Sequence, residues 1–164
     1  MGLFSFDIVS DYDKHEMDNV LDQARREITS RYDFKGTSAS IDADGDKTKL
    51  KIVGDNDYQI DAIIDVLRKK SAMRGISQKV FDVSQNNVTS GMTVFKEVQL
   101  KSGLDQEKAK KITKLIRDKY PKIKTQIQGQ EIRVSSSKKD ELQSVMSLVK
   151  ETDFDFPLSF TNFR

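Results

Sequence analysis

The chain has 164 residues, of which 36% are hydrophobic and 33% charged, and its formal net charge is +2. This length allows one sizeable core or two small ones, and the composition is that of a soluble globular protein. The absence of cysteine excludes disulfides, thiolate nucleophiles and thiolate metal sites. No apolar run approaches the roughly 20 residues of a membrane span, and the first residues do not have the pattern of a signal peptide. We therefore expect a cytoplasmic protein with no membrane partner.

Charge is distributed unevenly along the chain. Residues 1–90 carry 13 basic and 16 acidic side chains, whereas residues 91–164 carry 15 basic and 10 acidic ones. Between Lys101 and Lys124 there are nine basic residues against three acidic ones. Such a basic segment indicates an anionic partner, either a nucleotide or a nucleic acid. The alternative is a solvated, lysine-rich helix face without a partner.

The first half of the chain alternates strand and helix patterns. Residues 4–9 alternate apolar and polar side chains, which predicts a half-buried strand. Asp13 followed by Glu16 is a helix-start signal, and apolar residues at helical spacing continue to about Ser30. The next expected elements are strands at 38–42 and 48–53, joined by an Asp44-Gly45 turn, and a helix that begins at 55–57.

The second half continues in the same way. Gln78–Val83 predicts a short strand, and the polar segment Ser84–Gly91 predicts a loop, which is the best candidate for a linker. The later expected elements are a strand at Thr93–Leu100, a helix between Gly103 and Pro121, a hairpin at 122–135, a helix capped by Ser136 or Ser137, and a strand at 154–160.

The hairpin has one apolar and one polar face. Ile and Val side chains alternate with polar ones that include Lys124, Glu131 and Arg133. This pattern predicts that helices cover one side of the sheet and leave the other side bare. Lys138 and Lys139 follow at the start of the next helix, where unpaired N–H groups favour an anion. The bare face and this lysine pair are therefore the main candidates for ligand binding.

The order strand, helix, two strands, helix, strand occurs twice. Phe6 is matched to Phe95 at a spacing of about 89 residues, and the helix residues Ile60–Leu67 are matched to Leu142–Val149. A unit of this order folds as a four-stranded antiparallel sheet with both helices on one face, which is the ferredoxin-like or RNP-like arrangement. We therefore predict an α+β fold of two such domains.

Four motifs, in this order along the chain, resemble the YajQ family of bacterial proteins. They are SFDIVSD from Ser5, RYDFKG from Arg31, KIKTQIQGQEIRVSSSKKDELQSVM from Lys122, and the final FTNFR. The resemblance covers nearly the whole chain. Tyr32 stands where Phe is expected, and residues 135–137 are richer in Ser than expected, but neither departure changes the assignment.

The resemblance implies two RNP-like domains that exchange strands. Residues 11–101 form the first, completed by the middle strand 93–100; residues 1–10 with 102–164 form the second, completed by the N-terminal strand 4–9. It also implies a cytoplasmic nucleotide-binding protein, with cyclic di-GMP the signalling ligand reported within the family and RNA binding the alternative. No enzymatic activity and no cofactor come with it. A transcription regulator is the candidate downstream partner.

Anion binding and base stacking require cations and accessible rings. The candidate phosphate-binding residues are Arg31, Lys35, Lys111, Lys114, Arg133, Lys138 and Lys139. Phe34 and Phe163 are the candidates for stacking on a base. Arg133 can bind a phosphate or a guanine edge through its guanidinium fork, or it can pair across strands with an acid such as Glu131. Arg164 is either part of a surface tail or a ligand clamp.

Motifs of enzymes and metal sites are incomplete or missing. Residues 42–46 resemble the start of a calcium loop, but Lys47 occupies the required Gly position and Val53 the position of the final Glu. His15 is the only histidine and falls in the first turn of a predicted helix. The sequence has no P-loop, GxGxxG, GxSxG or HExxH motif and no RNP1 string. We therefore predict no metal site and no catalytic residue.

Overall fold

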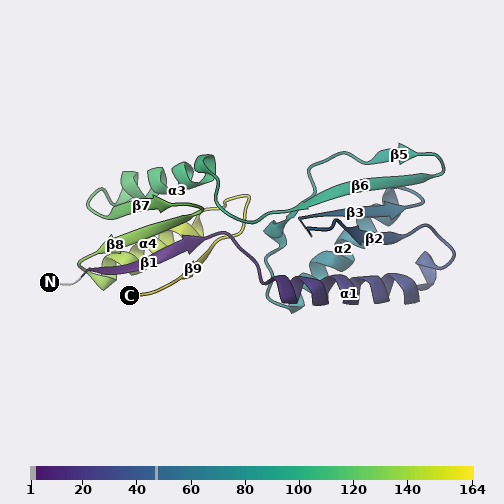
Figure 1. The fold of residues 1–164 in the computed structure, drawn as a ribbon, viewed down its shortest axis with the longest axis horizontal. Helices are drawn as coiled ribbons and strands as arrows, with labels where there is room; N and C mark the ends of the chain where they lie inside the picture. Colours follow the sequence, from purple (N-terminus) through teal and green to yellow (C-terminus); the bar gives the residue numbers. More distant parts are fainter. Residues whose placement is uncertain (1–2, 47) are drawn as a thin grey trace. The chain divides into compact units, whose positions relative to one another are not determined.

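The computed structural model describes residues 3–46 and 48–164. Lys47, at which the calcium-loop pattern fails, lies outside the described residues. The chain forms two compact units (Figure 1). Unit 1 comprises the residues up to Asp11 together with Ser102–Arg164, and unit 2 comprises Tyr12–Lys101. No helix of the described segments has both the length and the apolar character that a bilayer crossing requires.

Unit 2 contains a five-stranded antiparallel sheet and two long helices. Its strands lie in the order β2-β3-β6-β4, and β5 pairs with β6. Its elements are α1 (Lys14–Ser30), the short helix η1 (Tyr32–Phe34), β2 (Ser40–Ala43), β3 (Lys49–Gly54), α2 (Asp57–Met73), the short helix η2 (Gln78–Val80), β4 (Phe81–Asp82), β5 (Val88–Ser90) and β6 (Thr93–Leu100).

Unit 1 contains a four-stranded antiparallel sheet and two helices. Its strands lie in the order β7-β8-β1-β9. Its elements are β1 (Phe4–Val9), α3 (Gln106–Lys119), β7 (Lys124–Gln128), β8 (Glu131–Ser136), α4 (Lys139–Glu151) and β9 (Ser159–Thr161).

The two faces of each sheet differ in burial. In unit 1, Phe6 and Ile132 have no exposed surface and belong to the core that α3 and α4 close, whereas Glu131 is exposed. In unit 2, Leu50 is buried and its neighbour Lys51 is exposed. Each sheet therefore carries helices on one face and leaves the other face polar. The predicted α+β fold of two ferredoxin-like domains is confirmed.

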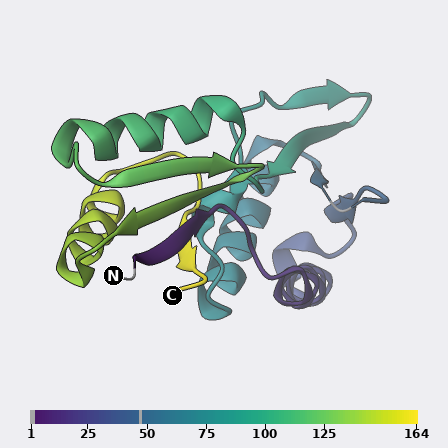
Figure 2. The same ribbon diagram turned by 60° about the vertical axis from the view of Figure 1, so that its left-hand side comes forward.

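β1 and β6 occupy the same place in their two sheets. β1 pairs with β8 on one edge and with β9 on the other, and β6 pairs with β3 and with β4. Figure 2 shows β1, at the beginning of the chain, beside β8, which comes more than a hundred residues later. The chain passes from unit 1 into unit 2 after Asp11 and returns after Lys101.

The strand repeat is displaced by one residue from the predicted spacing. Ile8 pairs with Ile132, and Val98 pairs with Leu50. Ile132 and Leu50 are counterparts, because each is the buried second residue of its strand, β8 or β3. Ile8 therefore corresponds to Val98, 90 residues further along the chain. The predicted spacing of about 89 residues therefore holds to within one residue, but the match of Phe6 to Phe95 is wrong, because Phe6 corresponds to Lys96.

This displacement puts the two matched phenylalanines in different environments, because side chains alternate between the faces of a strand. Phe6 is fully buried in the core of unit 1. Phe95 is only partly buried, on the bare face of the unit 2 sheet, where Lys51 Nζ lies 4.5 Å from its ring centroid.

Two predicted boundaries are also wrong. The segment Ser84–Gly91, predicted to be a linker, contains β5, which pairs with β6 inside unit 2. All residues of β5 are exposed, so this edge strand has no apolar pattern that could reveal it. The last strand is shorter than predicted, because only Ser159–Thr161 pairs with β1, whereas Phe156 fills the core from irregular backbone.

A pair of alanine substitutions tests the displaced repeat. Phe6→Ala should destabilise unit 1 by about 3–5 kcal/mol, because it empties a buried ring position in a packed core. Phe95→Ala should cost unit 2 about 1 kcal/mol, because its ring is partly solvated. The measurement is urea unfolding with hydrogen exchange resolved by unit, since a chain of two units need not unfold in one step. Equal losses would contradict the displacement.

Candidate functional site

A cavity of about 230 Å³ in unit 1 brings charged, aromatic and amide side chains together. It lies between the first residues of β1, the first turns of α4 and the end of the chain. The lining residues of chemical interest are Phe4, Lys139, Gln143, Phe163 and Arg164. Met146 and Leu142 from α4 close its apolar side.

The strand register positions the β1 side of the cavity. Phe4 pairs with Ser136, the last residue of β8, so its ring lies on the helix side of the sheet next to the beginning of α4. Lys139, the first residue of α4, places Nζ 5.1 Å from the Phe4 ring centroid. A cation over an aromatic face is attracted by the ring quadrupole, so the ammonium is held at the cavity wall.

The beginning of α4 differs from the predicted cap. Lys138 occupies the N-cap position, and its side chain makes no cap hydrogen bond. Ser136, two residues earlier, caps the helix instead: its hydroxyl oxygen accepts from the Lys138 N–H at 3.1 Å, and its O–H donates to a Glu141 carboxylate oxygen. Glu141 and Asp140 in the first turn offset part of the positive potential of the two lysines.

The end of the chain forms the opposite wall of the cavity. Phe163 is 63% exposed. Its ring stacks on the Phe6 ring, with the centroids 6.1 Å apart and an interplanar angle of 28°. The Arg164 N–H donates to the Ser5 carbonyl at 3.0 Å, and the Ser5 N–H donates to the Arg164 carbonyl at 3.2 Å. Residues 163 and 164 are therefore attached to β1 and do not trail into solvent.

Behind this wall, on the bare face of the sheet, Asp7 holds two partners. Asp7 is 3% exposed; its Oδ1 accepts from Arg133 Nε at 3.1 Å and its Oδ2 from Asn162 Nδ2 at 2.9 Å. Burial acts to raise the pKa of Asp7, but the hydrogen bonds from Arg133 and Asn162 and the charges of Arg133 and Arg164 outweigh it. The pKa of Asp7 is therefore held below its ordinary value, and the carboxylate is ionised at neutral pH.

The predicted phosphate ligand Arg133 is thus engaged by an acid of its own sheet. The sequence left open a cross-strand pair as the alternative for this residue, and the structure contains that pair, with Asp7 in place of Glu131.

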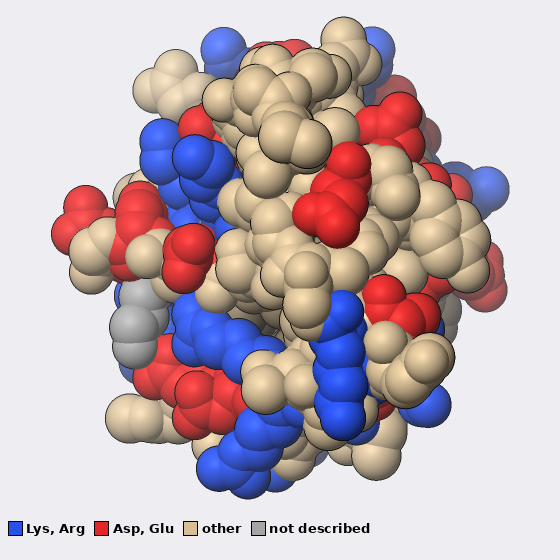
Figure 3. Space-filling model, turned by 90° about the vertical axis from the view of Figure 1, so that its right-hand side faces the viewer, with Lys and Arg blue, Asp and Glu red and all other residues tan. Residues whose placement is uncertain are grey.

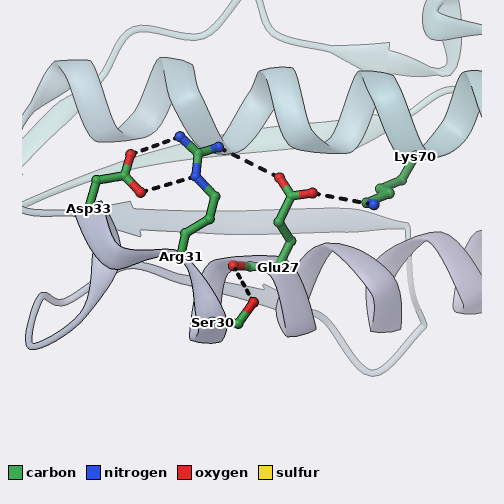
Figure 4. Close-up of polar contacts among 5 residues, drawn as sticks. All are labelled: Glu27, Ser30, Arg31, Asp33 and Lys70. Atoms are coloured by element: carbon green, nitrogen blue, oxygen red, sulfur yellow. Dashed lines mark hydrogen bonds and ion pairs between the residues drawn. The ribbon is translucent and has the colours of Figure 1, made fainter.

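Arg31 in unit 2 is also occupied by acids (Figure 4). Its Nε and Nη2 donate to the two carboxylate oxygens of Asp33 at 3.0 and 2.8 Å, and its Nη1 lies 3.6 Å from Glu27. Glu27 in turn contacts Lys70 Nζ at 3.3 Å. The bound Asp33 raises the pKa of Arg31 above its ordinary value. The guanidinium fork that a phosphate would need is filled by the Asp33 carboxylate.

The other predicted residues of unit 2 do not form a site with Arg31. Phe34 is 4% exposed and belongs to the unit 2 core, so a base cannot stack on it without opening that core. Lys35 is exposed. The end of unit 2 seen in Figure 3 shows Lys and Arg side chains interspersed with Asp and Glu side chains, without a patch of one sign.

Lys111 and Lys114 are exposed on α3, opposite the helix face that buries Ile112 and Ile116, and they do not line the cavity.

Of the predicted residues the structure therefore brings Lys139 and Phe163 together, with Lys138 next in the chain. Sequence reasoning missed Phe4 and Gln143 as cavity residues, and it assigned no role to Asp7 or Asn162. The only signals for these residues were their positions: Phe4 in the alternating pattern of the first strand, Asp7 in SFDIVSD, Gln143 in the long motif from Lys122, and Asn162 in FTNFR.

Comparisons with known proteins cover the whole of this arrangement. The family model described as "Nucleotide-binding protein YajQ-like" matches residues 4–164. A protein of Trichodesmium erythraeum is 48% identical over 160 residues, which cover 98% of this chain and 97% of its own. Proteins of Nocardioides sp. and Klebsiella pneumoniae are 49% and 44% identical over 98% of both chains. All three are named nucleotide-binding protein.

Because Asp7 is ionised in the folded state, the free energy of unfolding of unit 1 should depend on pH. A carboxyl group with a depressed pKa in the folded state stabilises the fold above its unfolded pKa, about 3.9, and loses that contribution as pH falls through the folded value. Asp7→Asn should therefore lower the free energy of unfolding of unit 1 by about 1–3 kcal/mol at pH 7. Urea unfolding at pH 7 and pH 3 measures this. The difference between wild type and variant should shrink at pH 3, and a constant difference would show that the charge of Asp7 is not responsible.

Proposed function

The chain belongs to the YajQ-like family, and on that premise we propose that it is a non-catalytic nucleotide-binding protein whose cavity in unit 1 takes a guanine nucleotide, with cyclic di-GMP the leading ligand. The observation that carries this proposal is the grouping of Lys139, Arg164, Phe4 and Phe163 around one cavity. A nucleotide presents an anionic phosphate beside a flat aromatic base, and this wall offers a partner for each.

The base is assigned to Phe163. This ring is the most exposed aromatic side chain of the cavity, and stacking a base on an aromatic ring contributes about 1–3 kcal/mol to binding. Gln143 lines the same cavity, and its amide can donate to and accept from the edge of a purine. The phosphate is assigned to Lys139 and Arg164, with Lys138 at the N-cap of α4 close by.

The size of the cavity limits what enters it. A volume of about 230 Å³ is below the roughly 300–1,000 Å³ of pockets that enclose a drug-sized ligand. We therefore propose that one base with its phosphate enters the cavity and that the rest of a larger ligand, such as the second half of cyclic di-GMP, remains outside on the surface of unit 1.

The assignment as a binding protein and not an enzyme rests on the names of the relatives and on the chemistry of the site. Asp7, a buried acid of unit 1, is occupied by Arg133 and Asn162 and makes a poor general base. A binding protein of this kind acts through a second protein, and we propose a transcription regulator for that role on the family resemblance alone. Guanine nucleotide recovered chemically unchanged after prolonged incubation is the expected result.

A second candidate function is RNA binding, and one observation favours it. Four cations at successive outward positions of α3, Lys110, Lys111, Lys114 and Arg117, are all exposed. A basic helix face of this kind attracts a phosphate backbone, whatever its base sequence. RNA binding through α3 and nucleotide binding in the cavity use different residues, so that substitutions separate them.

Titration calorimetry with GMP, GTP and cyclic di-GMP tests the nucleotide proposal. Lys139→Ala and Phe163→Ala should each raise the Kd about tenfold, because the first removes a proposed phosphate contact and the second the proposed stacking ring. Lys111→Ala, which changes another exposed lysine that does not line the cavity, is the matched control and should leave the Kd unchanged. Absence of heat with all three nucleotides would contradict the proposal.

Salt titrations with a short single-stranded RNA test the alternative. The affinity should fall with salt, and the double variant Lys111→Ala/Lys114→Ala should reduce the slope of log K against log salt by about 0.7 for each phosphate that is no longer neutralised. Lys139→Ala should leave this slope unchanged if RNA binds through α3 alone. An RNA affinity that does not depend on salt would exclude the alternative.

A further inference from the structure

We propose that Asp7 and Asn162 are positioning residues that hold a β-bulge at the end of β9 and thereby fix Phe163 as the wall of the cavity. Neither residue lines the cavity. The inference rests on the nucleotide site proposed above, but it makes a claim of its own about the end of the chain, which can be measured without a ligand.

The bulge is visible in the pairing of β1 with the end of the chain. Asp7 pairs with Thr161, and two positions earlier in β1 the backbone of Ser5 exchanges both hydrogen bonds with Arg164. One residue of β1, Phe6, therefore lies opposite two residues, Asn162 and Phe163. An extra residue in one strand of an antiparallel pair bends that strand and redirects a side chain.

Asn162 supplies the backbone conformation that this bulge needs. Its φ is +57°, and it is the only residue other than glycine with a positive φ among the described residues 3–46 and 48–164. Side chains other than those of Asn, Asp and Gly rarely adopt this region. The amide of Asn162 adds a second constraint, because its Nδ2 donates to Asp7 Oδ2 at 2.9 Å.

Asp7 links this amide to the rest of the sheet. It lies on the strand between β8 and β9, and its other oxygen accepts from Arg133 on β8. With 3% exposure it is shielded from competition by water, which makes these hydrogen bonds more directional and stronger than surface ones. The carboxylate thus ties the bulge to two neighbouring strands through side chains alone.

The bulge also positions the Phe163 ring, which lies on the helix side of the sheet, where the ligand is proposed to bind. The bulge places the Phe163 ring against Phe6, which is fully buried, while leaving 63% of the Phe163 residue exposed. A ring held in this way loses little freedom when a base stacks on it, and preorganisation of this kind improves affinity without a further interaction. Loosening the bulge should therefore weaken stacking on Phe163 and leave the contacts of Lys139 intact.

The experiment uses the full chain and GMP as the probe. Asn162→Gly keeps a backbone that tolerates positive φ and removes only the amide. Asp7→Asn removes the charged acceptor, and Ser135→Ala, on the same bare face in β8, where it pairs with Ser5, is the control. Because the chain has no tryptophan, Phe163→Trp in each background is a single fluorescent reporter of the ring position.

Asn162→Gly and Asp7→Asn should raise the Kd for GMP by up to about tenfold, the loss expected when one base no longer stacks. Without ligand, the reporter should show lower anisotropy and easier quenching by acrylamide in both variants, and Ser135→Ala should change neither quantity. In a double-mutant cycle, Asn162→Gly should have no further effect once Phe163 is Ala, because the amide acts only through that ring. A purely structural role would give additive effects.

Three results decide against the proposal. They are a reporter as well ordered in Asn162→Gly and Asp7→Asn as in wild type, a loosened reporter with an unchanged Kd, and additive effects in the cycle. If wild type binds no GMP, the proposed function fails by itself. The reporter then decides this inference, since loosening in the two variants supports the positioning role and unchanged order overturns it.

Discussion

Pairing of β1 on both of its edges is the constraint on which unit 1 depends. The strand meets β8 along one edge, in a single register from Phe4 to Ile8, and β9 along the other edge. Because side chains alternate between faces, that register decides which residues enter the core and which reach the bare face. A slip of one residue would bury Asp7 against the helices and expose Phe6. The cavity, the bulge and the buried carboxylate all follow from the same alignment.

Side chains on the two faces of β1 make different kinds of contact at the same end of the strand. On the helix side, Phe4 and Phe6 support the cations and rings of the cavity. On the bare side, Asp7 gathers Arg133 and Asn162. A bulge opposite Phe6 connects the two faces. Asn162 is bonded to Asp7 on the bare side, and the next residue, Phe163, places its ring on the helix side. The proposed binding site and the residues proposed to support it thus lie on opposite faces of one strand.

The arginines show why a basic residue in a motif is a weak indicator of a ligand site. A guanidinium fork fits a carboxylate as well as a phosphate, so an acid nearby in the fold competes with any ligand. Asp33 accepts hydrogen bonds from two nitrogens of the Arg31 guanidinium, and Asp7 accepts one from Arg133 Nε. Lys139 is in a different position, since it is exposed and contacts an aromatic ring at the cavity wall. The proposed nucleotide site therefore depends on this lysine and on Phe163 more than on the arginines that the motifs made prominent.

The sequence by itself determined the helices, most strands, the α+β class and the family, because hydrophobic periodicity, the Asp13 cap and four ordered motifs are local properties. The match of Phe6 to Phe95 was off by one residue, since two similar residues in a sequence contain no information on which residues pair across the strands. Only the tertiary structure decided which cations are occupied, which ring is accessible and where the bulge lies. Asp7 meets Arg133 and Asn162 across separations of 126 and 155 residues, and contacts at such distances follow from strand pairing and not from any local pattern.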